Sequence, residues 1–439
     1  MNVEYNPKKL TNTDSLRDKK VLIIGVGAVG SITGELLTRN RTGLVSVLDK
    51  DVYEADNLPK SSAIIRFPED IGKSKALALA ERLNAVSDAG CRAVGNHLDL
   101  KRIGPAALSG FDYIVLALDN NSMKVFACEL ISAVPEDKRP IYLSGGTNKE
   151  FSEAMMFVPG GACLRCTIPD EFLKSEDPEI VFSCAARVNL LLPTKQQEIV
   201  STSGVAGIKC AVDIDDLILA HSGGLHDFSK SERCIQHAYP IKEGHRTVIM
   251  KHSSCPVCAS KLPEQVSVLP GCTARSTLKE LLDMISGYFE GAFRLNVHRL
   301  IIPSVNITQC YQDFIIRAEC GACGDSFPLM RHSGLIRRDE IICPYCGGSY
   351  TKSKGDGSDV ISVSSFDYGS GEELLNKRLF DLGYPIGAYY EAEEILSSDT
   401  EGEIDFLSEE LSLSLPVSRF FSLDEDETYL HETHLSITG

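Results

Sequence analysis

Residues 20–30 read KVLIIGVGAVG, and this stretch decides the fold of the N-terminal part of the chain. After its first residue, the run from Lys20 to Ile24 is continuously apolar, which is typical of a parallel strand buried on both faces. A glycine triplet, Gly25, Gly27 and Gly30, follows at once and indicates a tight turn into a helix. The stretch therefore predicts a strand, a turn and a helix in succession.

The alternation of strands and helices continues beyond this turn. Residues 44–48 and 113–118 are predicted strands, and the Ala/Leu periodicity of residues 73–83 indicates a helix between them. Strands that alternate with helices form a mostly parallel sheet with helices on both faces. We therefore predict an α/β fold, Rossmann-like and doubly wound.

The glycine triplet also suggests a ligand. Glycines at this position bring backbone N–H groups and a helix N-terminus against a bound phosphate. Asp49 ends the next predicted strand, where a carboxylate accepts hydrogen bonds from ribose hydroxyls. A strand–helix turn that only packs tightly would carry the same glycines. A nucleotide cofactor is the interpretation we favour, and other motifs must identify it.

Length and charge limit the class of protein. The chain has 439 residues, enough for two or three domains, and its net charge of −17 argues against nucleic acid as the main partner. It starts MNVEYNPKKL without a signal-peptide pattern and has no apolar stretch of membrane-spanning length, so we expect a cytoplasmic protein. In that reducing compartment its 15 cysteines should bind metal or react as thiolates.

Eight of the cysteines fall in four C-x-x-C pairs. The last two pairs, Cys320 with Cys323 and Cys343 with Cys346, have the spacing of a zinc ribbon, which is a strong signal on its own. A ribbon of this kind either binds a partner or only stabilises a small module, and the sequence leaves both roles open.

Three further motifs resemble one known family. They are LDKDVYEADNL at residues 48–58, DIGKSK at 70–75 and ALDNNSMK at 117–124. Together they resemble the signature of the ThiF/MoeB and ubiquitin-activating superfamily, approximately D-x-D-x-V-x-x-x-N-L-x-R-Q, G-x-x-K and D-N-x-x-x-R. The resemblance covers about residues 18–220 and is supported again at Cys255 and Cys258. A dehydrogenase has no reason to carry all three motifs, so the resemblance implies ATP as the nucleotide.

The resemblance implies a role for each matching residue. Asp49 would hold the ATP ribose, and Asn57 would lie near the phosphates. Lys75 would bind phosphate oxygens, and Asp119 would help to hold Mg²⁺ and the triphosphate. Attack of a carboxylate on the α-phosphate gathers negative charge in a small volume, so cations must be held there beforehand. The implied cofactor site consists of Gly25, Gly27, Gly30, Asp49, Asp51, Asn57, Lys75, Asp119 and Asn120.

The chain departs from the family pattern where relatives have Arg followed by Gln, because Lys60 and Ser61 stand there instead. Lys60 keeps the positive charge but loses the planar guanidinium fork, and Arg66 is a candidate replacement. The N-terminal R-Y-x-R-Q stretch, with which homodimeric relatives supply an arginine to the neighbouring subunit, is missing. These departures leave the binding of the γ-phosphate open. A bland alternative is that Lys60, Lys73 and Lys75 are solvated surface lysines, but Lys75 has the family spacing.

The first two C-x-x-C pairs lie far apart in the sequence, so spacing alone would not pair them. The resemblance assigns them to one zinc ion that ties the crossover segment to the domain, with a redox dithiol as the alternative. The expected ligands of two structural Zn²⁺ ions are Cys163, Cys166, Cys255 and Cys258, and Cys320, Cys323, Cys343 and Cys346.

Cys184, in the stretch FSCAARVN, lies where several family members carry a cysteine in the crossover loop. There a thiolate can attack an acyl-adenylate to give a thioester, and Arg187 nearby could lower the thiol pKa. The alternative is an inert buried cysteine, since free cysteine is among the most buried residues. Cys210, Cys234 and Cys272 are weaker candidates for the same role.

We therefore expect three parts of the chain: a ThiF-like adenylation domain at residues 1–272, a zinc-ribbon module at 273–365, and a C-terminal segment with an acidic tail at 366–439. The expected activity is ATP-dependent adenylation of the C-terminal glycine carboxylate of a ubiquitin-like or sulfur-carrier protein. The implied catalytic residues are Cys184, Asp119, Lys60 and Arg66.

Two alternatives stay open at this point. The first is an adenylyltransferase for a peptide or sulfur carrier that stops at the adenylate, and the second is a non-catalytic scaffold subunit. A thioester-forming enzyme would need a downstream conjugating protein as a further partner. The resemblance also implies a homodimer. We expect no contact with a membrane.

Overall fold

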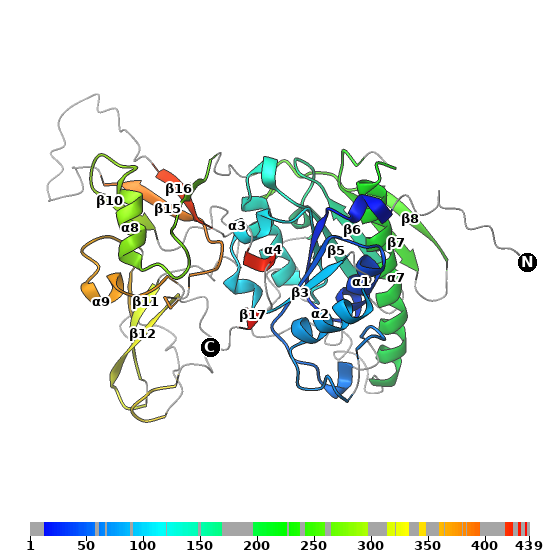
Figure 1. Ribbon diagram of the computed structural model, residues 1–439, viewed down its shortest axis with the longest axis horizontal. Helices are drawn as coiled ribbons and strands as arrows, with labels where there is room; N and C mark the ends of the chain where they lie inside the picture. The colour runs from blue at the N-terminus through cyan, green and yellow to red at the C-terminus, as the bar shows by residue number, and fades with distance from the viewer. Residues whose placement is uncertain are drawn as a thin grey trace, which may run out of the picture.

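The predicted strand at residues 20–24 is strand β1, and it lies inside a nine-stranded sheet (Figure 1). The order of the sheet is β17-β3-β2-β1-β4-β5-β6-β7-β8. This computed structural model describes residues 13–57, 61–65, 68–87, 91–119, 121–147, 151–168, 196–225, 228–237, 242–259, 265–296, 314–320, 322–332, 342–347, 360–363, 365–379, 381–382, 384–395, 418–424, 429–431 and 435–436.

The sheet is mostly parallel, as predicted. From β17 to β5 every neighbouring pair runs parallel, and β6, β7 and β8 are added antiparallel at the far edge. The strands are β1 (Lys20–Ile24), β2 (Leu44–Asp49), β3 (Arg92–His97), β4 (Tyr113–Leu116), β5 (Ile141–Thr147), β6 (Phe151–Phe157), β7 (Glu232–His237), β8 (Lys242–Val248) and β17 (Leu435–Ser436).

Helices cover both faces of this sheet, because successive residues of a buried strand point to opposite sides. One face buries Val21 and Ile23 of β1 against α1, α2 and α7, and the other buries Leu22 and Ile24 against α3 and α4. The doubly wound Rossmann-like fold is thereby confirmed. The helices are α1 (Ala28–Arg39), α2 (Lys75–Val86), α3 (Pro105–Ser109), α4 (Asn121–Ala133) and α7 (Gln196–Ser222).

The predicted helix at residues 73–83 is α2, and it begins two residues later than expected, at Lys75. The side chain of Ser74 caps its N-terminus by accepting a hydrogen bond from the backbone N–H of Leu77 at 3.4 Å. This cap fixes where the helix begins.

A second, five-stranded sheet has the order β14-β10-β15-β16-β9 and is covered by α8, which begins at a capping box between Thr277 and Glu280. Figure 1 shows this sheet and a smaller three-stranded sheet, β12-β11-β13, beside the nine-stranded sheet. Their elements are β9 (Ser267–Leu269), α8 (Leu278–Ser286), β10 (Phe293–Asn296), β11 (Phe314–Glu319), β12 (Ser326–His332), β13 (Val360–Val363), β14 (Ser365–Phe366), α9 (Glu372–Leu375), β15 (Tyr390–Glu394) and β16 (Ser418–Leu423).

The five-stranded sheet draws strands from both sides of residue 365, since β9 and β10 precede this position and β15 and β16 follow it. The C-terminal segment therefore contributes to a folded core. The expected domain boundaries at residues 272 and 365 stay predictions. Within the described ranges, none of the helices combines the length and the apolarity that a membrane crossing requires.

The residues around Ile386 connect this second part to the large sheet. The backbone N–H of Ile386 donates to Arg102 O at 2.8 Å, and its carbonyl accepts from Gly104 N at 2.7 Å. A Cβ on Gly387 would lie 2.3 Å from Ala107 N, so only glycine allows this approach. Ile386 itself is buried in the same core as α3 and α4.

The turn between β1 and α1 leaves no room for a Cβ at two of its three glycines. Gly25 has a φ of +95°, and a Cβ there would lie 2.6 Å from Ala117 O. On Gly30 a Cβ would lie 1.9 Å from Gly25 O, whereas on Gly27 it would meet no atom within 4 Å. Gly25 and Gly30 are therefore required for packing, and Gly27 keeps the space in front of the helix open.

This difference gives a testable prediction on stability. Gly30→Ala should lower the free energy of unfolding by about 1–3 kcal/mol, because backbone atoms must move to admit the methyl group. Gly27→Ala, the matched control, should cost less than about 1 kcal/mol, the difference between glycine and alanine at an N-cap. Urea unfolding followed by circular dichroism measures both values. Equal losses in the two variants would contradict the packing described here.

Candidate functional site

The glycine turn lies at the carboxyl edge of the large sheet. Because β1, β2 and β4 are parallel, their carboxyl ends lie at one edge, and the strand order changes direction between β1 and β4. Ligands of open α/β sheets bind at such switch points. Helix α1 begins there at Ala28, directly after its N-cap Gly27, and none of the described side chains caps this N-terminus. Its free backbone N–H groups suit an anion such as phosphate.

Asp49, at the end of β2, is held beside this turn. Its Oδ2 accepts a hydrogen bond from Val26 N at 2.6 Å, and its Oδ1 accepts one from Asp51 N at 2.8 Å. Burial raises the pKa of Asp49, and the two backbone hydrogen bonds act against this rise. Each carboxylate oxygen keeps further lone pairs, so Asp49 is able to accept hydrogen bonds from ligand hydroxyls.

Lys75 supplies a positive charge next to the same carboxylate. Its Nζ lies 3.6 Å from Asp51 Oδ2, and its charge acts, like the two backbone hydrogen bonds, against the rise that burial causes in the pKa of Asp49. The backbone N–H of Lys75 donates to Asp51 O at 2.9 Å, which fixes the start of α2 against the end of β2. The Lys75 side chain is 15% exposed, so it is not one of the freely solvated surface lysines.

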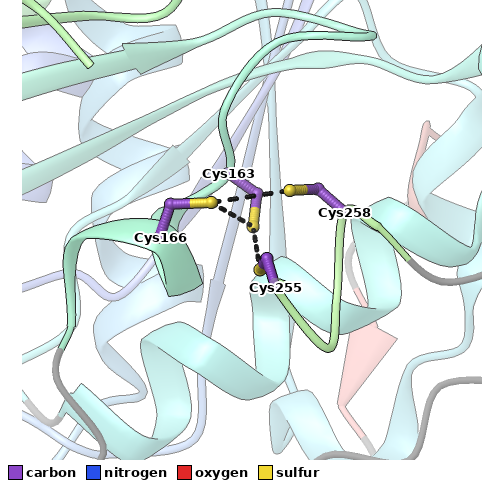
Figure 2. Close-up of side chains that lie close together, drawn as sticks. All are labelled: Cys163, Cys166, Cys255 and Cys258. Atoms are coloured by element: carbon purple, nitrogen blue, oxygen red, sulfur yellow. Dashed lines mark hydrogen bonds between the residues drawn. The ribbon is translucent and has the colours of Figure 1, made fainter. Parts of the chain in front are cut away.

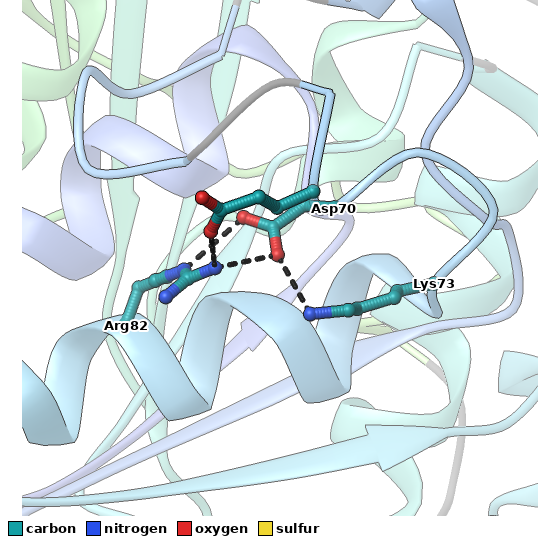
Figure 3. A network of polar contacts seen from close by, with 4 residues as sticks. Asp70, Lys73 and Arg82 are labelled. Atoms are coloured by element: carbon teal, nitrogen blue, oxygen red, sulfur yellow. Dashed lines mark hydrogen bonds and ion pairs between the residues drawn. The ribbon is translucent and has the colours of Figure 1, made fainter.

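A buried carboxylate, Asp70, organises the loop that leads to Lys75 (Figure 3). Asp70 has no exposed side-chain surface and contacts Arg82 Nη2 at 2.8 Å and Lys73 Nζ at 3.1 Å. The loop is also tied to Tyr53, whose carbonyl accepts from Gly72 N at 2.8 Å. Lys73 therefore serves this loop, and Asp70 and Arg82 help to position Lys75. Their spacing in the sequence gave no sign of this contact.

Asn57 and Asp119 complete the described part of the expected cofactor site. Asn57 accepts a hydrogen bond at its Oδ1 from Glu54 N at 2.9 Å, inside its own loop. Asp119 is exposed and follows β4 at the carboxyl edge, two residues beyond Ala117, whose N–H donates to Ile24 O at 2.8 Å. Outside the described residues lie Lys60, Arg66, Asn120, Cys184 and Arg187.

Lys124 belongs to this edge but was not predicted. It lies on α4, is 8% exposed, and donates from Nζ to Gly145 O at 2.6 Å. The sequence did carry a signal, since Lys124 occupies the arginine position of the motif D-N-x-x-x-R. A buried cation on the first turns of α4 adds positive charge where an anionic ligand would lie.

Two of the weaker cysteine candidates are buried away from solvent. Cys210 on α7 is 0% exposed, and burial raises the pKa of its thiol to about 12, so little thiolate forms near pH 7. Cys272 is 1% exposed in the core under α8. Cys234 lies in β7. Cys210 and Cys272 are therefore poor nucleophiles in this fold.

The first two C-x-x-C pairs meet on the α4 face of the large sheet (Figure 2). Cys163 Sγ lies 3.6 Å from Cys255 Sγ, and Cys166 Sγ lies 3.5 Å from Cys258 Sγ. Zinc–sulfur bonds of about 2.3 Å in a tetrahedron place ligand sulfurs about 3.8 Å apart. The four thiols therefore fit one Zn²⁺ ion, and the fold brings together the pairs that spacing could not.

The second set has the same geometry. Cys320 Sγ lies 3.6 Å from Cys346 Sγ, Cys323 Sγ lies 3.7 Å from Cys343 Sγ, and all four sulfurs lie within 4.8 Å of one another. Gly324 and Gly347 follow the pairs with φ of +76° and +71°, the left-handed turn that glycine adopts readily. This set also fits one tetrahedral Zn²⁺ ion.

Comparison with known proteins gives one family. The sequence profile of the ThiF family matches residues 4–314. The tRNA threonylcarbamoyladenosine dehydratase of Escherichia coli (strain K12) is 23% identical over 209 residues, which cover 47% of this chain and 70% of that protein.

Two activating enzymes match over shorter stretches. The ubiquitin-like modifier-activating enzyme 5 of Drosophila grimshawi is 27% identical over 170 residues, which cover 36% of this chain and 41% of that protein. Its Dictyostelium discoideum counterpart is 33% identical over 78 residues, which cover 18% and 20%. The chain thus spans less than half of either activating enzyme.

Among solved structures, the crystal structure of E. coli MccB with ATP aligns with a TM-score of 0.43. The sequences are 18% identical, and the alignment covers 56% of this chain and 68% of that one. This likeness is too loose to carry an argument about function.

The two thiol clusters give a prediction on metal content. The purified protein should contain two zinc ions per chain by plasma mass spectrometry, because each cluster has the distances of a tetrahedral site. Cys166→Ser should reduce the content to about one. Cys210→Ser, a buried cysteine outside both clusters, is the control and should keep two. A parent content near one ion would show that one of the clusters binds no zinc.

Proposed function

The chain belongs to the ThiF family, and from this premise we propose that it uses ATP to adenylate the C-terminal carboxylate of a small protein or peptide. The observation that carries the proposal is the arrangement at the carboxyl edge of the sheet. There the uncapped N-terminus of α1, the fixed carboxylate of Asp49 and the positive charge of Lys75 lie next to one another. This set suits a nucleotide with a charged phosphate chain.

In the proposed reaction an oxygen of the substrate carboxylate attacks the α-phosphorus of ATP. A new P–O bond forms, the bond from the α-phosphorus to the bridging oxygen breaks, and its electron pair leaves with pyrophosphate. Asp49 orients the ribose through its free lone pairs, and the N-terminus of α1 holds the phosphates. Lys75 stabilises the negative charge that gathers on the phosphate oxygens in the transition state. Space in front of Gly27 lets the nucleotide approach the backbone.

Asp119 is the proposed carboxylate for a divalent cation. It is exposed at the same edge, and hard cations such as Mg²⁺ prefer carboxylate and phosphate oxygens. Mg²⁺ bound there would neutralise charge on the triphosphate and on the leaving pyrophosphate. Lys60 or Arg66 is proposed for the γ-phosphate, in place of the arginine found in relatives.

A protein or peptide substrate fits this chain better than RNA. The relative from E. coli carries tRNA in its name, but the present chain has a net charge of −17, which would repel a polyanion. The substrate proposed here is a ubiquitin-like or sulfur-carrier protein with a C-terminal glycine. We place the protein in the cytoplasm, as a homodimer, with a downstream conjugating protein if a thioester forms.

The thioester step is a separate part of the proposal. Acyl transfer needs a thiolate within reach of the mixed anhydride. Burial of Cys210 and Cys272 removes two candidates, and of the remaining two, Cys184 and Cys234, we prefer Cys184 as the acceptor because it lies where several family members carry a cysteine. If the chain has no acceptor, the reaction ends at the adenylate.

The adenylation step predicts exchange of labelled pyrophosphate into ATP when the small protein substrate is present. Asp119→Ala should reduce this exchange by at least about 100-fold, since an electrostatic group of the transition state is lost. The matched control is Asp137→Ala, another exposed aspartate, located in the turn after α4 and away from the carboxyl edge. If Asp119→Ala exchanges as well as Asp137→Ala, Asp119 does not hold the metal.

The thioester step predicts a reductant-sensitive adduct between the chain and its small protein substrate on a non-reducing gel. Cys184→Ala should abolish the adduct but leave pyrophosphate exchange nearly unchanged, because adenylation needs no thiol. Cys210→Ala serves as the control and should keep the adduct. An adduct that persists in Cys184→Ala would transfer the role to another thiol, and a parent protein without any adduct would favour an enzyme that stops at the adenylate.

A further inference from the structure

A cavity lies at the amino edge of the large sheet, opposite the glycine turn. It has a volume of about 270 Å³ and is formed where β1, β2 and β3 begin, at residues 20, 44 and 92. The proposed nucleotide site uses the carboxyl ends of these strands. The cavity and the proposed nucleotide site therefore lie at opposite ends of these strands.

Half of the residues that line this cavity are basic. Arg17, Lys19, Lys20 and Arg92 contribute positive charges, and Asp18 contributes the single carboxylate of the lining. The positive charge of Lys19 is partly neutralised by Asp112, a residue outside the lining, because Lys19 Nζ lies 2.9 Å from an oxygen of Asp112. Within the described part of the chain, the side chains of Lys20 and Arg92 meet no carboxylate. In a protein with a net charge of −17, such a local excess of positive charge is a marked exception.

A buried histidine completes the lining. His431 is 8% exposed, its ring packs edge-on against Phe111 at 4.5 Å, and its Nε2 has no hydrogen-bond partner among the described residues. Burial, and then the charges of Lys20 and Arg92, lower the pKa of His431 to about 4. The imidazole is therefore neutral near pH 7, and it forms an uncharged part of the lining.

We propose that this cavity binds a small phosphate-bearing anion. The guanidinium fork of Arg92 matches two phosphate oxygens, the ammonium of Lys20 adds a second charge, and the neutral ring of His431 lines the cavity beside them. The volume exceeds what one phosphate group fills but lies just below the range of about 300–1,000 Å³ for pockets of drug-sized ligands. Inorganic phosphate or the phosphate monoester of a small molecule fits these limits.

The binding is linked to the docking of the C-terminal segment. His431 belongs to the 3-10 turn Tyr429–His431, in which Leu430 is 0% exposed and its carbonyl accepts from Ser46 Oγ at 2.8 Å. Strand β17 then continues parallel to β3. Without this docking the cavity loses its histidine wall, so an anion that contacts His431 stabilises the docked segment.

The test uses full-length protein labelled with ¹³C-histidine, and follows the Cε1–H NMR signal of His431, assigned with His431→Gln. Titration with inorganic phosphate should shift this signal and saturate, whereas chloride at equal ionic strength should not. Arg92→Ala and Lys20→Ala should each raise the half-saturation concentration of phosphate at least about 10-fold, because each removes one charge-assisted hydrogen bond. Both residues are exposed, so their removal should leave the fold intact.

Two controls separate this site from the proposed nucleotide site and from general charge. Lys75→Ala removes a cation of the carboxyl edge and should leave the titration at His431 unchanged, and so should Lys279→Ala on α8. Glycerol 3-phosphate tests which kind of phosphate the cavity binds. Tighter binding than that of inorganic phosphate indicates a phosphate monoester as the ligand, and weaker binding indicates free phosphate. The proposal fails if neither compound shifts the His431 signal, or if Arg92→Ala and Lys20→Ala titrate like the parent.

Discussion

The close approach of the glycine turn to the end of β4 is the constraint on which the rest of the structure depends. Gly25 packs against the carbonyl of Ala117, and Gly30 packs against the carbonyl of Gly25, so α1 begins directly beneath the turn. Helix α1 then points its N-terminus at the place where the sheet order changes direction. A larger residue at either position would move the helix away from β1 and β4, and with it the backbone N–H groups that face the proposed nucleotide.

Side chains from distant segments complete this edge because buried charges must be compensated. Asp70 is fully buried, and its pairing with Arg82 and Lys73 satisfies its charge while it fixes the loop before α2. The same loop carries Lys75 to the carboxylates that end β2. Asp49 in turn accepts two backbone N–H groups, so the ends of β1 and β2 are held together by one side chain. The loop fixed by Asp70 therefore holds the positive charge of Lys75 at the carboxyl edge.

The α4 face and the amino edge of the large sheet are completed by segments that lie far along the chain from β1. The first thiol cluster joins residues near 163 to residues near 255 over α4, and Cys163 and Cys255 are part of the apolar core there. Ile386 and Leu430 enter the same core. The large domain is thus closed by three returning segments, each of which covers apolar surface that β1 to β4 and their helices leave open. The docking of the last of them supplies the histidine wall of the amino-edge cavity.

The sequence by itself determined the features that arise from short-range chemistry. Strand β1, its glycine turn and α1 follow from residues 20–39, because apolar runs and glycine spacing act within a few residues. Cys320 and its three partners were paired by ribbon spacing, and Asp49, Lys75 and Asp119 were singled out through motifs of the ThiF family. The profile match confirmed the family, and the roles of these residues stay predictions. The helix that starts at Lys75 was located within two residues.

Only the tertiary structure decided what depends on contacts between distant segments. The meeting of Cys163 and Cys166 with Cys255 and Cys258, the burial of Asp70 and the place of His431 under the sheet leave no local pattern in the sequence. Lys124 was missed although its motif was recognised, since only the fold shows that the α4 surface carrying it is buried against β5. The physical reason is the same in each case: burial is fixed by which surfaces the folded chain brings together, and a local stretch of sequence cannot specify them.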